Sequence, residues 1–398
     1  MHVLMIPSWY RSPQFPLNGV FFREQAHALK DAGYRMGVVV PGQYSVLVMR
    51  QYGRWRYREA FENDDDIPTY SSYTCAWFPL VPYANTHSWL KHGMRLFERY
   101  LREVGRPDLI QAQAAFQAGI LAERIKRRYG IPYVLSEHSS MFLEGRVSFW
   151  QMPLVRRAWA EADARTVVSP KLGEATERYF GAVAGGWTWL PNMVERQFFE
   201  MPLRPARGRS REFRFLHLAH FTSTKNQPDL IRAFAGRFRG EVDVVLRIGG
   251  DGASRPALEA LAARLGIRNQ VRFLGMLSRD RALQEMLAAD TFVLSSHFET
   301  FSIVLAEALA CGTPVVSTAC GGPECIVNDT NGLLVPPGDV RALGQAMAAV
   351  RERAGWYDAE AIRRDCARRF SQEVVVAKWT QIYETVLARS GAAGRRAV

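Results

Sequence analysis

Short apolar runs alternate with helical patterns along almost the whole chain, and this alternation limits the fold to the α/β class. The first unit is a strand at 3–6, a helix at 20–32 closed by Gly33, and a strand at 36–40. A strand, a helix and a second strand at this spacing form a crossover between parallel strands. A second series of the same kind starts at Phe215, so we expect two α/β domains.

A segment with several prolines and arginines and little periodicity separates the two series, and we interpret it as a linker. A chain of 398 residues is long enough for two domains of ordinary size. We place the first domain at residues 1–192, the linker at 193–211 and the second domain at 212–370. A last helical pattern starts at Ser371 and ends in a basic tail.

Charge and cysteine content restrict the partners and the compartment. The formal net charge of +12 and the pI near 9.7 favour phosphates or an acidic membrane face as partners. Because the excess positive charge is spread over both halves, we expect no nucleic-acid partner. Five scattered cysteines without a C-x-x-C pair indicate a reducing cytosol and no metal site. We also expect no transmembrane helix and no signal peptide.

The stretch from Ser295 to Val316 carries the strongest chemical signal. It follows an apolar run at 291–294, of the length of a buried parallel strand, and contains a helical pattern that ends at Gly312. Glu299 falls in the turn, and Glu307 lies just over a turn inside the helix. The backbone N–H groups of residues 300–303 open the helix and form an anion site. Such a site suits a ligand with hydroxyls and phosphates, although glutamates at these positions are often surface residues.

Three further candidates follow other strands, at the edge where open α/β sheets bind ligands. Lys225 precedes a helix, where its charge would face a bound phosphate, or only solvent as on an ordinary surface lysine. Gly19 would let a ligand approach the backbone, or would simply form a turn. His138 follows the strand at 133–136, where a histidine is either functional or a satisfied loop residue.

Other motifs are weak or absent. The run Asp64-Asp65-Asp66 is similar to the D-x-D of metal-dependent sugar transferases, but its charged loop, away from strand ends, favours a solvated turn. The chain has no G-x-G-x-x-G, no P-loop, no G-x-S-x-G and no H-E-x-x-H. Redox, P-loop, serine hydrolase and zinc protease functions therefore lose their main support.

Two basic, aromatic segments lie in the first half of the chain. Residues 46–60 form a hairpin or an excursion that includes Arg50 and Arg58. Residues 88–104 form an amphipathic helix, in which Trp89 and Phe97 stand among lysines and arginines. Such a helix either packs its apolar stripe on its own domain or rests on an anionic bilayer.

Together these features resemble glycosyltransferase family 4, whose members are retaining enzymes with the GT-B fold of two Rossmann-like domains facing across a cleft. The most specific match is the E-x7-E motif formed by Glu299 and Glu307, with residues 308–316 behind it. The other matches are Asn18-Gly19-Val20-Phe21, Ala28 to Tyr34, Pro107-Asp108-Leu109-Ile110, Leu190-Pro191-Asn192, Gly249 to Gly252, Phe273-Leu274-Gly275 and Gly321-Gly322-Pro323-Glu324.

The resemblance implies a role for each candidate residue. Glu299 would contact hydroxyls of the donor sugar and Glu307 the nucleotide ribose. His138 would face the donor sugar at the reaction centre, which makes His138 and Glu299 the expected catalytic residues. Gly19 would let the first loop approach the leaving phosphates. The donor diphosphate would be held by His220, Lys225, Thr300, Phe301, Ser302 and Ile303.

Two departures from the family pattern concern the diphosphate. Many members have an arginine five residues before the lysine, where this chain has His220. The first glutamate is usually followed by Gly-Phe-Gly, whereas Thr300-Phe301-Ser302 stands here. Ser302 adds a hydroxyl but has less backbone freedom than glycine.

The expected function is retaining, metal-independent transfer of a sugar from a UDP- or GDP-sugar to a hydroxyl of a glycan or polyprenyl-linked acceptor, in bacterial cell-surface polysaccharide synthesis. We expect no cofactor, a cytoplasmic location, and peripheral binding to an anionic surface on the inner face of the cell membrane. The helix at 371–389 would cross back onto the first domain. The alternatives are a non-catalytic GT-B scaffold that binds nucleotide sugars or glycans, and a nucleotide-sugar epimerase.

Overall fold

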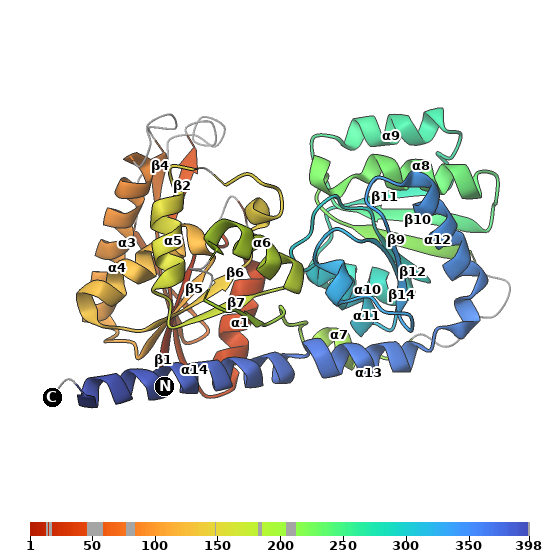
Figure 1. The fold of residues 1–398 in the computed structure, drawn as a ribbon. Helices are drawn as coiled ribbons and strands as arrows, with labels where there is room; N and C mark the ends of the chain where they lie inside the picture. Colours follow the sequence, from red (N-terminus) through yellow and green to blue (C-terminus); the bar gives the residue numbers. More distant parts are fainter. Residues whose placement is uncertain are drawn as a thin grey trace. The chain divides into compact units, whose positions relative to one another are not determined.

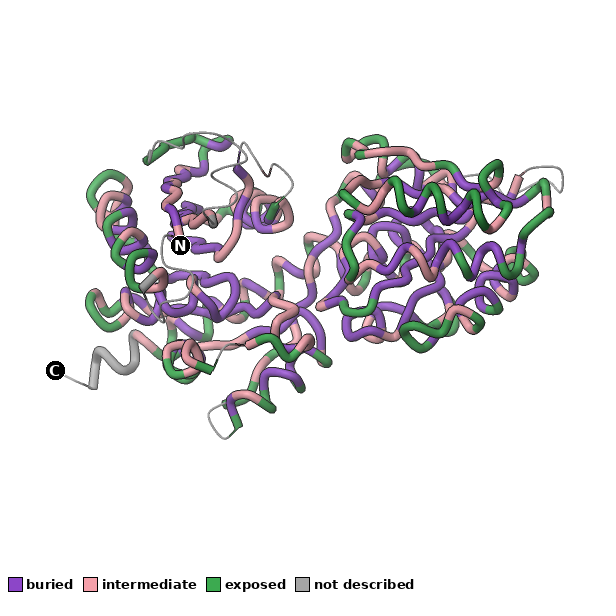
Figure 2. Tube along the Cα trace, turned by 90° about the horizontal axis from the view of Figure 1, so that it is seen from above, coloured by how far each residue is buried: buried purple, intermediate pink, exposed green. Residues whose placement is uncertain are grey.

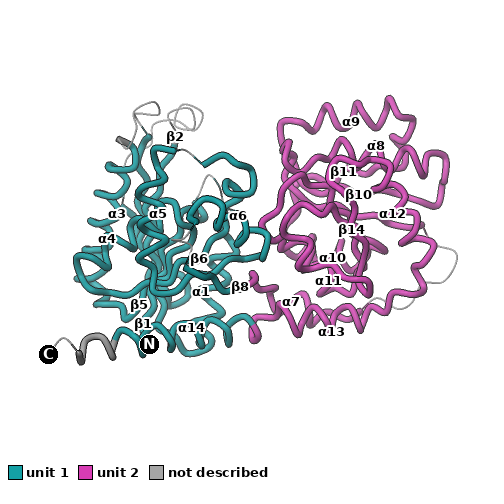
Figure 3. Tube along the Cα trace, in the orientation of Figure 1, with its two compact units in different colours: residues 1–190, 375–398 teal, residues 191–374 magenta. Residues whose placement is uncertain are grey.

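The computed structural model describes residues 1–12, 15, 18–45, 59–76, 84–147, 149–181, 185–203 and 212–396 (Figure 1). The chain divides into two compact units (Figure 3). Unit 1 comprises residues 1–190 and 375–398, and unit 2 comprises residues 191–374. Each unit is an α/β domain built on its own sheet, as the alternation of strands and helices predicted.

Unit 1 has an eight-stranded sheet in the order β3-β4-β2-β1-β5-β6-β7-β8. Neighbouring strands are parallel except in the β3–β4 hairpin. The strands are β1 (His2–Pro7), β2 (Arg35–Ser45), β3 (Glu59–Asp64), β4 (Ile67–Ala76), β5 (Leu109–Gln113), β6 (Tyr133–Glu137), β7 (Ala164–Val167) and β8 (Thr188–Trp189). The helices are α1 (Val20–Asp31), α3 (Ala84–Glu103), α4 (Ile120–Tyr129), α5 (Met152–Ala160), α6 (Pro170–Phe180) and most of α14 (Gln372–Arg396).

Unit 2 has a six-stranded, parallel sheet in the order β11-β10-β9-β12-β13-β14. The strands are β9 (Phe213–Leu218), β10 (Val244–Gly249), β11 (Val271–Gly275), β12 (Thr291–Leu294), β13 (Val315–Thr318) and β14 (Gly332–Val335). The helices are α7 (Gln197–Glu200), α8 (Gln227–Phe238), α9 (Arg255–Arg264), α10 (Arg279–Ala288), α11 (Ile303–Ala310), α12 (Val340–Glu352) and α13 (Ala359–Phe370).

The central strands are buried along their whole length. Every residue of β1, β5 and β6 in unit 1, and of β12 and β13 in unit 2, is buried. Figure 2 shows that buried residues concentrate in the middle of each unit. Strands buried in this way are typical of parallel sheets with helices on both faces, and they leave the strand ends as the place for a ligand.

Each sheet has a point where the strand order reverses. In unit 2 the chain runs outward from β9 through β10 to β11, and on the other side from β12 to β14, so the reversal lies between β9 and β12. In unit 1 the corresponding point lies between β1 and β5. Ligands of open α/β sheets bind at the carboxyl ends of the strands at such points. The candidates Lys225 and Glu299 follow β9 and β12, the two strands that flank the reversal in unit 2.

The two units and the described ranges bear on three of the predicted segments. Residues 193–203 of the predicted linker lie in unit 2 and include α7, while residues 204–211 lie outside the described part of the chain. Most of the predicted basic segment at 46–60 also lies outside it. The last helix counts with unit 1 from Val375 onward, and Trp379 and Tyr383 on it are completely buried.

Candidate active site

In unit 2, Lys225 and Glu299 form an ion pair at the strand reversal. The Lys225 Nζ donates to Glu299 Oε1 at 2.7 Å, and the Ser296 hydroxyl donates to the same oxygen at 2.7 Å. Lys225 ends a short turn after β9, and Glu299 lies in the loop between β12 and α11. Glu299 is only 8% exposed. The two residues that the sequence placed near a phosphate and a sugar are therefore direct neighbours.

The backbone of the two loops holds this pair in place. The His297 N–H donates to the carbonyl of Thr224 at 2.8 Å, and the Ser295 hydroxyl donates to the carbonyl of Lys225 at 3.0 Å. On its other side, Glu299 accepts a backbone hydrogen bond from Gly322 at 2.7 Å. Because the loop that carries Glu299 is bonded on both sides, the carboxylate is fixed before any ligand arrives.

The start of α11 has an unusual backbone. Ser302 adopts a left-handed conformation with φ 79°, which an L-residue with a Cβ adopts only at a cost. Its hydroxyl is buried and has no hydrogen-bond partner among the residues that the structure describes. Phe301 is buried against Phe370, and Thr300 is partly exposed. The amides of Leu305 and Ala306 donate to the Ser302 carbonyl, which leaves the first two amides of α11, those of Ile303 and Val304, without a carbonyl of the same helix to bond to.

Gly322 explains why this loop can lie so close to the segment after β13. A Cβ on Gly322 would lie 2.4 Å from the Cα of Phe301 and 2.5 Å from its backbone nitrogen, so no other residue fits at this position without a shift. Gly322 belongs to the Gly321-Gly322-Pro323-Glu324 motif that the sequence singled out. The motif therefore has a packing role at the predicted site.

Glu307 lies in the middle of α11 and is paired with an arginine that the sequence did not reveal. Arg279, at the start of α10, donates through Nη1 to Glu307 Oε1 at 2.7 Å. Arg279 also bonds Glu195 and stacks over the ring of Phe198, with its guanidinium carbon 4.9 Å from the ring centroid. Burial raises the pKa of Glu307, while Arg279 acts in the opposite direction. No sequence motif marks Arg279, because Glu307 and Glu195, which it bonds, lie 28 and 84 residues away.

His220 occupies an exposed position after β9. Its carbonyl accepts hydrogen bonds from the Gln227 amide at 3.1 Å and from the Thr222 N–H at 2.9 Å. Its ring has no hydrogen-bond partner within the described ranges. The backbone of this loop is thus anchored, while the side chain is open to solvent.

In unit 1, His138 is buried at the carboxyl end of β6. Its Nε2 lies 2.8 Å from Gln113 Oε1 and 3.0 Å from the Ser136 hydroxyl. Burial lowers the pKa of His138 to about 3, so the imidazole is neutral. Its Nδ1 is buried without a hydrogen-bond partner in the part of the chain described. The ring of Phe22 stands edge-on to the imidazole, with 5.0 Å between centroids.

Gly19 lies at the amino end of α1, three residues before Phe22. It has φ 66°, and a Cβ there would lie 2.8 Å from the carbonyl oxygen of Trp9 and 3.2 Å from the Phe22 ring. The close backbone approach expected at Gly19 therefore exists within the protein itself. Whether a phosphate also approaches it stays a prediction.

Glu137, at the end of β6 beside His138, has a structural role that the sequence did not predict. Glu137 is completely buried and accepts three backbone hydrogen bonds, from Ala115 at 2.8 Å, His138 at 2.9 Å and Ser139 at 2.6 Å. Burial raises its pKa to about 7, and the three N–H donors act in the opposite direction. One carboxylate thus ties the loop after β5 to the loop after β6.

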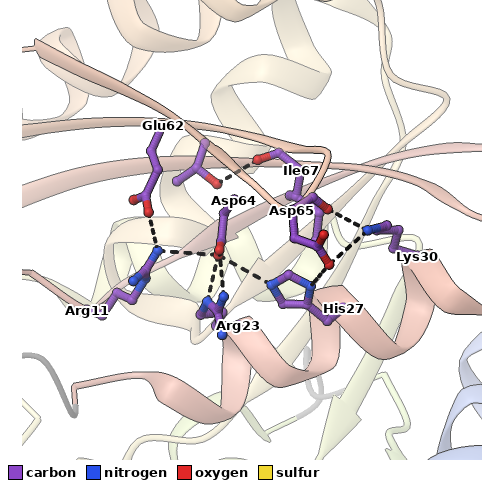
Figure 4. Close-up of polar contacts among 9 residues, drawn as sticks. Arg11, Arg23, His27, Lys30, Glu62, Asp64, Asp65 and Ile67 are labelled. Atoms are coloured by element: carbon purple, nitrogen blue, oxygen red, sulfur yellow. Dashed lines mark hydrogen bonds and ion pairs between the residues drawn. The ribbon is translucent and has the colours of Figure 1, made fainter.

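The Asp64-Asp65-Asp66 run joins β3 and β4, and Asp64 and Asp65 are engaged by basic side chains of the same unit (Figure 4). Asp64 is buried and accepts two hydrogen bonds of 2.6 Å from Arg23, so the expectation of a solvated turn is wrong for this residue. Asp65 and Asp66 are exposed and have positive φ. Within the described residues, no three histidines, cysteines or acidic residues are grouped so that they could hold a metal ion.

The amphipathic helix expected at 88–104 is α3, and it packs its apolar side on its own domain. Trp89, Phe97 and Tyr100 are at most 1% exposed. Of the two alternatives for this helix, the structure therefore favours packing over insertion into a bilayer. In the described ranges, no helix combines the length and the apolar character that a membrane crossing requires.

Two protein-family models together match most of the chain, one in each half. The model of the family "Glycosyl transferase 4-like domain" matches residues 19–193, and that of "Glycosyl transferases group 1" matches residues 203–361. Glycogen synthase of Mycobacterium tuberculosis is 27% identical over 75% of this chain and 73% of its own length. The putative teichuronic acid biosynthesis glycosyltransferase TuaC of Bacillus subtilis is 26% identical over 89% and 90% of the two chains. The structure of Anabaena HepE in complex with UDP-glucose matches 98% of this chain and 100% of its own, with a TM-score of 0.70 and 20% identity.

Proposed function

Because the chain belongs to the family 4 glycosyltransferases and has their GT-B fold, we propose that it moves a sugar from a nucleotide diphosphate sugar to a hydroxyl of an acceptor. The observation that carries this proposal is the Lys225–Glu299 pair beside the start of α11. A cation, a fixed carboxylate and free helix amides are the groups that a sugar diphosphate needs.

Unit 2 is the proposed donor domain. Lys225, the hydroxyl of Ser302 and the first amides of α11 bind the diphosphate. Glu299 accepts hydrogen bonds from hydroxyls of the sugar. Glu307 accepts a hydrogen bond from the ribose while Arg279 keeps its charge compensated. The UDP-glucose bound to HepE, a protein of the same fold, supports a uridine nucleotide as the first donor to test.

The proposed chemistry retains the configuration at the anomeric carbon and uses no metal. The bond between the anomeric carbon and the leaving phosphate oxygen breaks, and the acceptor oxygen forms its bond on the same face of the sugar. The proton of the acceptor hydroxyl goes to the leaving phosphate. Lys225 and the amides of α11 stabilise the charge on that phosphate, so catalysis rests on positioning and electrostatics. His138 contacts the sugar, and neither Glu299 nor Glu307 acts as a nucleophile.

Unit 1 is the proposed acceptor domain, and the acceptor is a glycan or a polyprenyl-linked glycan in cell-surface polysaccharide synthesis. The similarity to TuaC supports this class of acceptor. Since the apolar side of α3 is buried, we propose that only its charged side, with Lys91 and Arg95, meets an anionic membrane from the cytoplasm. Arg124, Arg127 and Arg128 of α4 line the same shallow pocket as these two residues.

The test is a thermal-shift panel of UDP, GDP and their sugar conjugates, followed by a transfer assay with the nucleotide that binds. Specific binding raises the melting temperature. Lys225→Met should abolish the shift, whereas Lys171→Met, which removes an exposed lysine paired with Glu174 in unit 1, should not. Activity unchanged by EDTA and an axial product from an axial donor would support metal independence and retention.

Three results would contradict the proposal. Binding without transfer or hydrolysis would indicate a non-catalytic scaffold. A change in the configuration of the free nucleotide sugar would indicate an epimerase. An equal thermal shift in Lys225→Met and in the native protein would remove Lys225 from the donor site.

A further inference from the structure

A chain of buried polar side chains leads from the last helix of the protein to His138, entirely within unit 1. Its members, which we call the glutamine chain, are Tyr383, Gln111, Gln25, Gln113 and His138. The contacts are Tyr383 hydroxyl to Gln111 Oε1 at 2.9 Å, Gln111 Nε2 to Gln25 Oε1 at 3.2 Å, Gln113 Nε2 to Gln25 Oε1 at 2.6 Å, and His138 Nε2 to Gln113 Oε1 at 2.8 Å.

Burying these groups is costly unless all of them are bonded. Gln111, Gln113 and Tyr383 are completely buried, and Gln25 and His138 are 6% and 7% exposed. Gln111 and Gln113 are two residues apart on β5, so both point to the face covered by α1, which carries Gln25. Apolar residues would fill the same space at lower cost, which indicates that the polarity of the chain has a use.

The direction of the hydrogen bonds is fixed at Tyr383. Among the described residues, the Tyr383 hydroxyl has no partner other than Gln111. If it accepted a hydrogen bond from Gln111, its own O–H would be a buried donor without an acceptor, which costs about 1–3 kcal/mol. Tyr383 therefore donates, and Gln111 turns its carbonyl oxygen toward it.

The orientation of each later side chain in the glutamine chain follows from the orientation of the side chain before it. Gln111 then donates through Nε2 to Gln25 Oε1, which also accepts from Gln113 Nε2. This leaves the carbonyl oxygen of Gln113 for His138, so His138 donates through Nε2, and the Ser136 oxygen, 3.0 Å from the same nitrogen, is a second acceptor. The reversed chain would place the ring proton on Nδ1, where it has no acceptor within the described part of the chain.

We propose that the glutamine chain is a positioning device that holds His138 as the neutral Nε2–H tautomer and keeps the lone pair of Nδ1 for a sugar hydroxyl. This inference rests on the proposed function only for the identity of the hydroxyl. Phe21 and Phe22 pack on the imidazole, and Phe21 is partly exposed, so Phe21 is the side chain that makes room for the hydroxyl. Tyr383, at the far end of the glutamine chain from His138, fixes the direction of its hydrogen bonds.

The tautomer can be read directly from long-range 1H–15N spectra of protein labelled at histidine, without any substrate. The His138 signals are assigned by their loss in His138→Gln. We expect a protonated Nε2 and an unprotonated Nδ1 in the native protein. A protonated Nδ1 would overturn the proposal, whatever the enzyme does with nucleotide sugars.

The role of Tyr383 is tested by removal and rescue. Tyr383→Phe keeps the ring and removes the donor, so we expect the second His138 tautomer to appear and kcat to fall about tenfold, with little change in the KM for the donor. Tyr34→Phe is the matched control, because Tyr34 packs on Tyr383 but bonds Thr380 at 2.7 Å instead of the chain.

A rescue experiment distinguishes an effect on the direction of the hydrogen bonds from an effect on the packing around residue 383. Adding Gln25→Glu to Tyr383→Phe places a carboxylate in the middle of the chain. Because a carboxylate only accepts hydrogen bonds, both Gln111 and Gln113 must donate to it. We expect the double variant to regain the single tautomer and most of the lost kcat. Unchanged spectra and kcat in Tyr383→Phe, or no recovery in the double variant, would refute the proposal. If the spectra behave as expected but the native protein transfers no sugar, the proposed function fails and the glutamine chain stands.

Discussion

Arg279 donates to Glu307 at 2.7 Å, so a glutamate that is only 3% exposed has its counter-charge on the preceding helix. The guanidinium is more open, with 35% of its side chain exposed, and it bonds Glu195 as well. One arginine thus compensates the second glutamate of the E-x7-E motif and links α11 to the segment before α7. The pair has consequences for stability that do not depend on any ligand.

Arg279→Met should destabilise the protein by about 3 kcal/mol, because it leaves a buried carboxylate without its partner. Glu307→Gln removes the charge instead and should cost less. Urea unfolding of unit 2 by fluorescence would measure both. As a control, Arg272→Met breaks the exposed pair with Glu212 and should cost under about 1 kcal/mol. An equally small effect of Arg279→Met would show that Glu307 does not depend on it.

Substitutions of Ser302 should raise the stability of the protein and weaken donor binding at the same time. Ser302→Ala removes a buried hydroxyl without a partner and should raise the free energy of unfolding by about 1 kcal/mol. Ser302→Gly also relieves the left-handed strain and should not destabilise. Both changes remove the hydroxyl proposed for the diphosphate, so UDP affinity should fall about tenfold in calorimetry.

The matched control for Ser302 is Ser317→Ala. Ser317 is completely buried, but its hydroxyl donates to the Thr318 carbonyl at 3.0 Å. Its loss should lower stability and leave UDP affinity unchanged. A more stable Ser302→Ala protein with unaltered affinity would exclude the Ser302 hydroxyl from the donor site.

Much of the fold could be predicted because its information is local. Strands such as β1 and β12 are short, continuous apolar runs, and their period and length stand out from the sequence alone. β4 was missed, because Thr69 and Ser72 occupy buried positions in it and weaken the apolar pattern. β2 extends to Ser45, beyond its apolar start, because it pairs with β4 over eight positions.

The residues of the candidate site also divide into those that could be predicted from the sequence and those that could not. Lys225 and Glu299 could be placed because each follows an apolar strand and open sheets bind ligands at strand ends. Arg279 and Tyr383 could not, since their partners are chosen by tertiary packing. The Tyr383 hydroxyl meets Gln111 across a separation of 272 residues, and no periodicity in the sequence encodes such a contact.

Glu137 should make the stability of unit 1 depend on pH. Its pKa is raised from 4.5 to about 7, so the folded state binds a proton that the unfolded state has released between these values. Its contribution to the free energy of unfolding is complete below pH 4.5 and falls as the pH rises to 7, by at most about 3 kcal/mol. His138 in the same unit, whose pKa is lowered by burial, acts in the opposite direction below pH 6.5.

The measurement is therefore a difference between two proteins. The difference between the urea unfolding of the native protein and that of Glu137→Gln, measured at a series of pH values, cancels the contribution of His138 and of every other group that the two proteins share. The native protein should lose stability relative to Glu137→Gln between pH 4.5 and 7. A constant offset is also expected, since the amide nitrogen of glutamine cannot accept the N–H of Ala115. A difference that stays flat over this range would mean that Glu137 titrates normally.

His220→Arg should strengthen donor binding. The backbone at this position is anchored through the His220 carbonyl, and the side chain is exposed, so the change should alter stability by less than about 0.5 kcal/mol. A guanidinium is always charged and can bond a phosphate with two N–H groups, which a histidine cannot. We expect the Kd for UDP to fall about threefold to tenfold, with a steeper dependence on salt.

The control must add the same charge elsewhere in unit 2. Val242→Arg does so at a residue that is 93% exposed and lies just before β10, at the opposite end of the strands from Lys225. If both variants tighten UDP equally, the gain comes from net charge alone. If only His220→Arg does, the loop after β9 faces the diphosphate. A loss of affinity in His220→Arg would mean that the histidine itself contacts the donor, and that this chain has replaced the arginine instead of merely lacking it.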